Sequence, residues 1–377
     1  MPPVRGSAAR EKQKCSECMR PYTMLDRIPN QVRHANRLVG VTDIDCMLNL
    51  QMDRNTFGRL CQLLKQRGGL TDVKCVSVEE QVAKFIGLLA YHKNSKFVDF
   101  TIEKSDQTVP DYVHEVLKAV LKLHDILVVQ PEPVPEDCLD PRWKWFKGCL
   151  GALDAAHINV LVDNEDKGRY RNKKREITTN NLVTCDRNLR FGYILVGWEG
   201  SASDIRVLRD AVFRDHGLKV PKGNYYLCDY GYTNSEGFLT LYKKVRYHLK
   251  DWGPAMDMPQ HAQELFNLRH AKARNTIERA VTVLKMRWGI LRSPVFFPIQ
   301  VQNRLIMASF YLHNFIRAEM DVDPIEQRLG VGPWESDNEE AHGDIPFVDA
   351  IDPSLDWNRK RDELAKAMWL HGHVCEV

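Results

Sequence analysis

Three carboxylates in otherwise apolar segments restrict the folds that this chain can adopt. Asp154 lies in the run GCLGALDAAHINVLV and Asp229 in the run GNYYLCDYGY, and both runs are typical of buried strands. Glu278 lies in NTIERAVTVLKMRWGILR, which is typical of a helix. A carboxylate in an apolar strand costs free energy unless it is paired or binds a cation. We therefore expect a fold in which two strands and a helix bring these side chains together.

The first half of the chain has helical periodicity from residue 46 to residue 127. One helix is predicted at 52–65, ending near Gly69, and the succession of helices resembles a helix-turn-helix unit. Its final helix begins with Asp111 and Glu115 and has no Arg where base contacts are usually made. This favours a packing domain over a reader of DNA sequence.

The periodicity changes after residues 130–142, a linker rich in Pro and acidic residues. Strands are predicted at 149–162, 177–184, 191–198 and 224–228, with a helix at 203–213 before the last of them. Further helices are predicted around Glu278, at 301–316 and at 357–370. Strands followed by helix, strand and helix indicate an α/β layer.

Charge is distributed unevenly along the 377 residues. Residues 1–44 carry a net charge of +4, residues 45–319 carry +8 and residues 320–377 carry −9. The basic middle indicates a polyanionic partner, and the acidic stretch 329–358 is typical of an exposed interaction segment. Residues 1–42 are polar, basic and rich in Pro and Ser, which predicts a disordered arm.

Cysteine usage and hydropathy indicate the compartment. The ten cysteines form no disulfide-like framework, and Cys15 and Cys18 make a lone CxxC that favours chance over a metal site. The chain has no signal peptide and no apolar run of about 18 residues, so a reduced intracellular compartment is expected, with no membrane association.

The three carboxylates fit one kind of chemistry well. Transfer of a phosphodiester requires neutralisation of charge on the attacking and leaving oxygens, and two cations about 3.5–4 Å apart provide it. Carboxylates from distant segments are the oxygen ligands that Mg²⁺ takes. Asp154, Asp229 and Glu278 are therefore our candidate catalytic residues and metal ligands. The alternative for Glu278, taken alone, is an ion pair with Arg274 one turn earlier.

Asp204 is a rival fourth carboxylate. Ser201 and Asp204 have the spacing of a capping box, in which Asp204 would be the third helical residue and would bond the backbone. This structural interpretation is favoured, although Asp204 could also support the metal ligands from a second layer.

Basic residues surround these acids in sequence and are candidates for contacts with DNA phosphates, which give affinity without sequence preference. The alternative is an ordinary solvated face. The candidates are Arg169, Arg171, Lys173, Lys174, Arg175, Lys243, Lys244, Arg246, Arg274 and Arg279.

With these residues placed, the chain resembles the PIF/Harbinger transposases and the nuclease-like proteins derived from them, most of all the plant members. The matching segments run in order over about residues 45–320 and include DPRWKWFKGCLGALDAAHI, GNYYLCDYGYTNSEGFLTLYKKVRYHLKDW and ELFNLRHAKARNTIERAVTVLKMRWGILR. The resemblance implies an RNase H-like α/β fold with a mixed sheet flanked by helices. It puts a DDE metal site on Asp154, Asp229 and Glu278.

The resemblance also implies partners, cofactors and a location. It implies DNA as the substrate and a separately encoded Myb/SANT-like protein for specific DNA binding. It implies a nuclear protein, with the cytoplasm as an option when that partner is absent. Two Mg²⁺ or Mn²⁺ ions are the expected cofactors, and a homo-oligomer is an option.

The chain departs from the family pattern beside the first ligand. Where the family commonly has Asp-Gly-Thr, this chain has Asp154-Ala155-Ala156, which adds a Cβ and removes a hydroxyl. Ile205 replaces a small polar residue, and Val281-Thr282 replaces Phe-Gly. These changes leave every ligand in place, so they bear on catalytic efficiency and not on the fold.

Two functions from different classes follow. The first is a metal-dependent DNA endonuclease or transposase-like enzyme, and the second is a domesticated, non-catalytic chromatin or transcription adaptor. An enzyme acting on RNA has no sequence feature in its favour beyond the fold. The predicted parts are an arm (1–42), a helical domain (43–130), an RNase H-like nuclease domain (143–318) and an acidic tail with a short helix (319–377).

Overall fold

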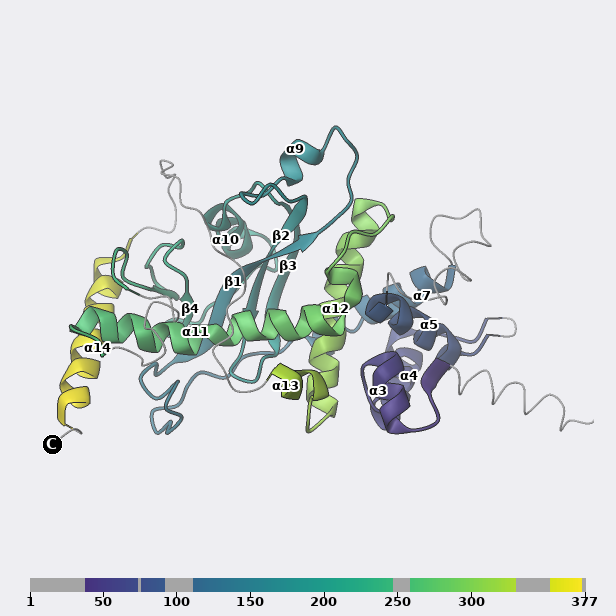
Figure 1. The fold of residues 1–377 in the computed structure, drawn as a ribbon, viewed down its shortest axis with the longest axis horizontal. Coiled ribbons are helices and arrows are strands. Elements are labelled where there is room, and N and C mark those ends of the chain that lie inside the picture. Colours follow the sequence, from purple (N-terminus) through teal and green to yellow (C-terminus); the bar gives the residue numbers. More distant parts are fainter. Residues whose placement is uncertain (1–37, 74–75, 92–110, 247–257, 330–352, 375–377) are drawn as a thin grey trace, which may run out of the picture.

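The computed structural model describes residues 38–73, 76–91, 111–246, 258–329 and 353–374 (Figure 1). Cys15 and Cys18 lie outside the described residues. So do residues 1–37 of the predicted basic arm and residues 330–352 of the predicted acidic segment. Within the described ranges, no helix is long and apolar enough to cross a membrane.

A five-stranded mixed sheet forms the centre of the fold, in the order β3-β2-β1-β4-β5. β1 pairs antiparallel with β2 and β2 with β3, whereas β4 pairs parallel with β1 and β5 with β4. The strands are β1 (Cys149–Asn159), β2 (Thr178–Cys185), β3 (Phe191–Glu199), β4 (Tyr225–Cys228) and β5 (Phe238–Thr240). The four predicted strands are therefore confirmed, and the three-residue β5 is an addition.

Helices cover both faces of this sheet, as the α/β prediction requires. Helix α10 (Asp204–Phe213) packs Val207 and Leu208 against Leu153 of β1 on one face. Helices α11 (Ala262–Arg287) and α12 (Ile299–Glu319) cover the other face, where Ile277 joins Ala152 in the main hydrophobic core. A mixed sheet flanked by helices and preceded by a helical region confirms the predicted fold class.

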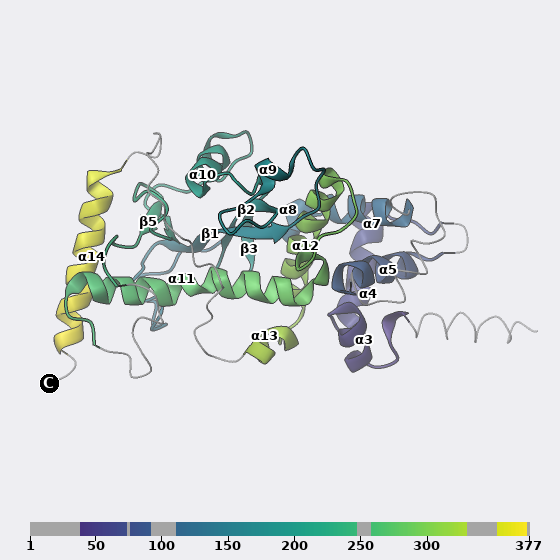
Figure 2. The same cartoon turned by 45° about the horizontal axis from the view of Figure 1, so that its top comes forward.

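Helix α11 is the longest element and links most of the others. Its 26 residues span about 39 Å and cross the sheet from end to end (Figures 1 and 2). His261 caps its start by accepting a hydrogen bond from the backbone N–H of Glu264. At that end it packs on the terminal helix α14 (Leu355–Val374), and at the other end it contacts α12 and the short α13 (Pro324–Leu329).

The N-terminal region is helical, as predicted, and shares the main hydrophobic core with the sheet. The predicted helix at 52–65 is α4, extended by a π-helical turn (Leu64–Gly68) that ends at Gly69 with φ +76°. Contacts between α7 and α12 join this region to the part that contains the sheet. Its helices are α3 (Asp43–Leu50), α4 (Arg54–Leu63), α5 (Val78–Tyr91), α7 (Asp111–Leu121) and α8 (His124–Leu127).

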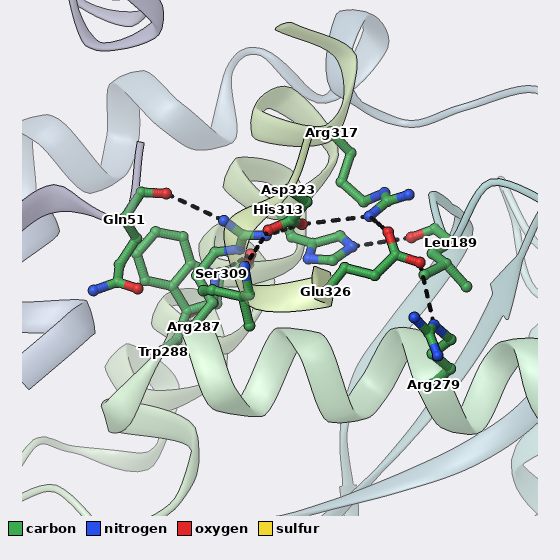
Figure 3. A network of polar contacts seen from close by, with 11 residues as sticks. Gln51, Leu189, Arg279, Arg287, Trp288, Ser309, His313, Arg317, Asp323 and Glu326 are labelled. Atoms are coloured by element: carbon green, nitrogen blue, oxygen red, sulfur yellow. Dashed lines mark hydrogen bonds and ion pairs between the residues drawn. The ribbon is translucent and has the colours of Figure 1, made fainter. Parts of the chain in front are cut away.

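A buried ion-pair network ties α11 to α12, to α13 and to the end of α3 (Figure 3). The Arg287 guanidinium has no exposed side-chain surface and pairs with Asp323. Arg287 Nη1 also donates to the carbonyl of Gln51 at 3.2 Å. Arg317 on α12 lies 3.3 Å from the same Asp323 carboxylate.

Glu326 extends this network along α13. It lies 2.5 Å from Arg317 Nη1 and 3.1 Å from Arg279 Nε. We call Arg279, Arg287, Arg317, Asp323 and Glu326 the basic cluster, because it contains three guanidinium groups and two carboxylates. It fixes α13 against α11.

Candidate active site

The position of Asp154 depends on an irregularity in β1. The pairing register with β4 shifts between Cys149 and Gly151, as at a β-bulge. Cys149 and, beyond the shift, Ala152 both pack on the α11 side of the sheet, whereas Leu150 and Leu153 pack on the α10 side. Alternation then directs Asp154 toward α11.

Only glycine fits at residue 151. Its φ is +138°, and a Cβ there would lie 1.9 Å from the backbone oxygen of Cys185. The sequence interpretation noted small residues before Asp154, and the structure shows that one of them sets the side to which Asp154 points.

Asp229 reaches the same side of the sheet by simple alternation. On β4, Leu227 packs toward α11 and α14, whereas Tyr226 and Cys228 pack toward α10. Asp229 is the first residue after the strand and therefore points toward α11. Because β1 and β4 are parallel neighbours, Asp154 and Asp229 lie near each other.

The third carboxylate comes from α11, and all three meet at one guanidinium. Arg274 Nη1 lies 2.8 Å from Asp154 Oδ2, and Arg274 Nη2 lies 2.6 Å from Glu278 Oε1. Asp229 Oδ1 lies 4.0 Å from Arg274 Nη2. The structure thus brings the three predicted carboxylates together, and it places Arg274 between them. We call these four residues the acidic cluster.

The acidic cluster is partly buried and rich in negative charge. The side chain of Asp154 is 24% exposed and that of Arg274 is 12% exposed. Burial raises the pKa of Asp154 to about 8; Arg274 opposes this rise, and the neighbouring Asp229 and Glu278 add to it. Burial acts to lower the pKa of Arg274, but the three carboxylates outweigh it and raise that pKa above its ordinary value.

The donor set suits a divalent cation. Three carboxylates supply the hard oxygen ligands that Mg²⁺ and Mn²⁺ take. In the described part of the chain, Asp229 Oδ1 is buried and has no hydrogen-bond partner. Among the described residues, no three His, Cys, Asp or Glu side chains are arranged as a ready metal site.

The capping prediction for Asp204 is wrong. Helix α10 begins at Asp204 itself, its N-cap is Ser203, and no side chain caps it. Asp204 is thus the first helical residue and not the third, and its Oδ1 accepts a 2.8 Å hydrogen bond from Asn180 Nδ2. It belongs to the α10 face of the sheet, opposite the face to which Asp154 points. A supporting role for Asp204 stays a prediction.

The predicted phosphate-binding residues differ in their surroundings. Arg171, Lys173, Lys174 and Arg175 are exposed and follow the short helix α9 (Lys167–Tyr170), and Lys243 and Lys244 are exposed beyond β5. Arg169 is also exposed and pairs with Glu199, while the less exposed Arg246 and Arg279 pair with Glu264 and Glu326. Their contacts with DNA stay a prediction.

The central position of Arg274 was missed by the sequence interpretation, which considered it as a surface partner of Glu278 and as a candidate phosphate contact. That i, i+4 ion pair does exist, but it is largely buried and also includes Asp154. The spacing of Arg274 and Glu278 was the available signal. The contact with Asp154, 120 residues away in sequence, had no local signal.

Comparisons with known proteins agree with this geometry. Residues 153–314 match a family model described as DDE superfamily endonuclease. Residues 33–122 match one described as a domain of unknown function, DUF8040. The first match begins beside Asp154 and contains all four residues of the acidic cluster.

Two curated proteins are similar over much of their length. "Protein ALP1-like" of Arabidopsis thaliana is 22% identical over 309 residues, 74% of this chain and 73% of that protein. "Putative nuclease HARBI1" of Rattus norvegicus is 25% identical over 228 residues, 58% of each chain. No solved structure matches the chain.

Proposed function

The chain belongs to the family of Harbinger transposase-derived DDE nucleases, and from this premise we propose that it is a metal-dependent enzyme that hydrolyses or transfers DNA phosphodiesters. The observation that supports this most is the meeting of Asp154, Asp229 and Glu278, from β1, the end of β4 and α11, at one point. A structural ion pair rarely places three carboxylates around one guanidinium, whereas a divalent-cation site commonly has several carboxylate ligands.

The three carboxylates would hold the metal. DDE endonuclease domains generally use divalent metal ions, and in this chain we propose two Mg²⁺ or Mn²⁺ ions. When bound, such ions activate the attacking oxygen and neutralise charge on the leaving oxygen. The carboxylates orient these ions from rigid elements, and the sheet and α11 keep the three groups in register.

Exposed basic residues would hold the DNA backbone. Lys173, Lys174 and Arg175 lie on one turn and Lys243 and Lys244 on another, and they are the strongest candidates because they are exposed. Such contacts give salt-dependent affinity without sequence preference. We propose that a Myb/SANT-like protein supplies sequence specificity and that the enzyme acts in the nucleus.

A cleavage assay tests the proposal. Purified full-length protein is incubated with DNA in Mg²⁺ or Mn²⁺, with and without a Myb/SANT-like partner that restores DNA binding. Asp154→Asn and Glu278→Gln should each lower the cleavage rate by at least about 100-fold, because each removes a charged ligand. Asp163→Asn, the same change at an exposed position outside the site, should leave the rate unchanged. Equal cleavage rates for wild type and Asp154→Asn would refute the proposal that the chain is an enzyme of this kind.

A non-catalytic adaptor is the second candidate. One observation favours it: Arg274 already neutralises part of the carboxylate charge without a metal ion. The replacement of Gly-Thr by Ala155-Ala156 beside Asp154 points the same way, because Ala156 is buried and brings no hydroxyl to the site. An adaptor would bind DNA together with its partner. Wild type and Glu278→Gln would then bind DNA equally well, and neither would cleave it.

A further inference from the structure

We propose that Arg274 is an internal counter-cation: it holds the three carboxylates together in the metal-free protein and gives up its contacts with them when a divalent ion binds. The inference rests on the proposed metal-dependent function and adds a regulatory step to the same site. In the metal-free protein Arg274 stabilises the site, and a divalent ion must compete with Arg274 for the three carboxylates.

The contacts of Arg274 show why the two cations compete. Arg274 Nη1 donates to Asp154 Oδ2 at 2.8 Å, while Asp154 Oδ1 accepts the backbone N–H of Ala155 at 2.8 Å. Both oxygens of this ligand are therefore engaged. Glu278 Oε1 is likewise engaged with Arg274 Nη2 at 2.6 Å. A divalent ion that binds Asp154 Oδ2 and Glu278 Oε1 must compete with Arg274 for these oxygens.

Charge repulsion adds to this competition. A guanidinium and a divalent cation that share the same carboxylates would lie within about 4 Å of each other, where their positive charges repel strongly in a partly buried site. When all three carboxylates are ionised, they leave an excess of two negative charges after Arg274 is counted. That excess attracts a divalent ion, whose binding relieves the need for Arg274.

Arg274 is also held only by the groups that it would release. Among the described residues, its Nε has no hydrogen-bond partner, and its ion pairs are all with the acidic cluster. Its side chain is 12% exposed, so it lies at the edge of the core. Arg287 on the same helix differs, because it is fully buried and is also bonded to the Gln51 carbonyl.

Binding of Mn²⁺ to the full-length protein tests the inference without reference to catalysis. Arg274→Met removes the competing charge and keeps a similar apolar stem, so its Kd for Mn²⁺ by isothermal titration should fall by at least about 10-fold. The matched control is Arg214→Met at the end of α10, on the opposite face of the sheet. It breaks an ion pair with Asp210, and its Kd should equal that of wild type.

The outcomes separate this inference from the proposed function. Equal Kd values for wild type and Arg274→Met overturn the inference and leave the metal site intact. Absence of Mn²⁺ binding by both proteins overturns the proposed function, and the inference with it. Binding by Arg274→Met alone supports the inference strongly, because it shows that the arginine excludes the metal.

Arg274→Lys guards against misfolding of the methionine variant. One ammonium cannot bridge Asp154 and Glu278 as the two Nη atoms do, so its Kd should lie between those of wild type and Arg274→Met. A Kd equal to or weaker than that of wild type would contradict the inference.

In wild type, the Arg274 guanidinium signal in an NMR spectrum, assigned by its loss in Arg274→Lys, should lose solvent protection on addition of Mg²⁺. An unchanged signal at saturating Mg²⁺ would overturn the inference.

Discussion

The two ion-pair clusters on α11 have opposite compositions. The acidic cluster sets three carboxylates against one guanidinium, and the basic cluster sets three guanidiniums against two carboxylates. In the basic cluster, each carboxylate lies between two arginines. In the acidic cluster, Asp229 Oδ1 is left without a hydrogen bond from the described residues.

This difference teaches how to separate structure from function among buried charges. In the basic cluster each carboxylate lies between two arginines, so removal of a carboxylate leaves a buried guanidinium without its charged partner. In the acidic cluster three carboxylates share one guanidinium, and this excess of negative charge favours a cationic ligand. The basic cluster is therefore expected to govern stability, and the acidic cluster to govern metal binding.

The largest effect is expected in the basic cluster. Asp323→Asn leaves Arg287 fully buried without its charged partner, which should lower the free energy of unfolding by about 3–5 kcal/mol. Denaturant unfolding measures this loss. The control is Glu319→Gln, which breaks a more exposed pair with Arg59 and should cost less than about 1 kcal/mol. Equal effects of the two changes would break the comparison.

A divalent ion should stabilise the protein through the acidic cluster alone. At about 100 times its Kd, Mn²⁺ should raise the free energy of unfolding by about 2.7 kcal/mol relative to EDTA. Asp154→Asn should abolish this gain, whereas Asp323→Asn should keep it although the protein is less stable. A gain that persists in Asp154→Asn would place the ion elsewhere.

A smaller effect follows from protonation of the basic cluster. Burial acts to raise the pKa of Asp323, but Arg287, His313 and Arg317 together hold it below its ordinary value of 3.8. A carboxyl whose pKa is lowered by folding stabilises the protein above its unfolded pKa and loses this contribution as the pH falls. The stability difference between wild type and Asp323→Asn should therefore shrink as the pH is lowered below about 4. A difference that is constant from pH 7 to pH 3 would contradict the ion pair.

The smallest effect is expected from the acidic cluster without metal. Asp154→Asn removes one of the excess negative charges of the acidic cluster, while Arg274 keeps its contact with Glu278. In EDTA the free energy of unfolding should change by less than about 1 kcal/mol, and a gain in stability would fit the excess charge. A loss as large as that of Asp323→Asn would show that the acidic cluster is also structural.

The positions of the two strand aspartates could be predicted because they depend on local patterns. Period-2 alternation and apolar runs are visible in the sequence, and they identified the strands that carry Asp154 and Asp229. The predicted first strand extended to residue 162, but β1 ends at Asn159. The apolar run continues past the end of pairing because Val160 is also buried in the core.

Other features had no local signal. The pairing of Arg287 with Asp323 joins residues 36 apart, and the contact of Arg274 with Asp154 joins residues 120 apart. Such contacts arise from how α11 lies on the sheet. The Ser201 capping box failed because Ser203 offered a second start two residues later, and sequence spacing does not distinguish the two. The shift at Gly151 appears only in the pairing with β4.

The continuity of α11 has a consequence for how this family can change. Arg274 and Arg287 belong to one unbroken helix, so the helix fixes the directions of their side chains relative to each other. Insertion or deletion of a single residue between them would turn one about 100° relative to the other. Either Arg274 would then leave the acidic cluster or Arg287 would leave the basic cluster. The length of this stretch is therefore expected to tolerate substitution far better than insertion or deletion.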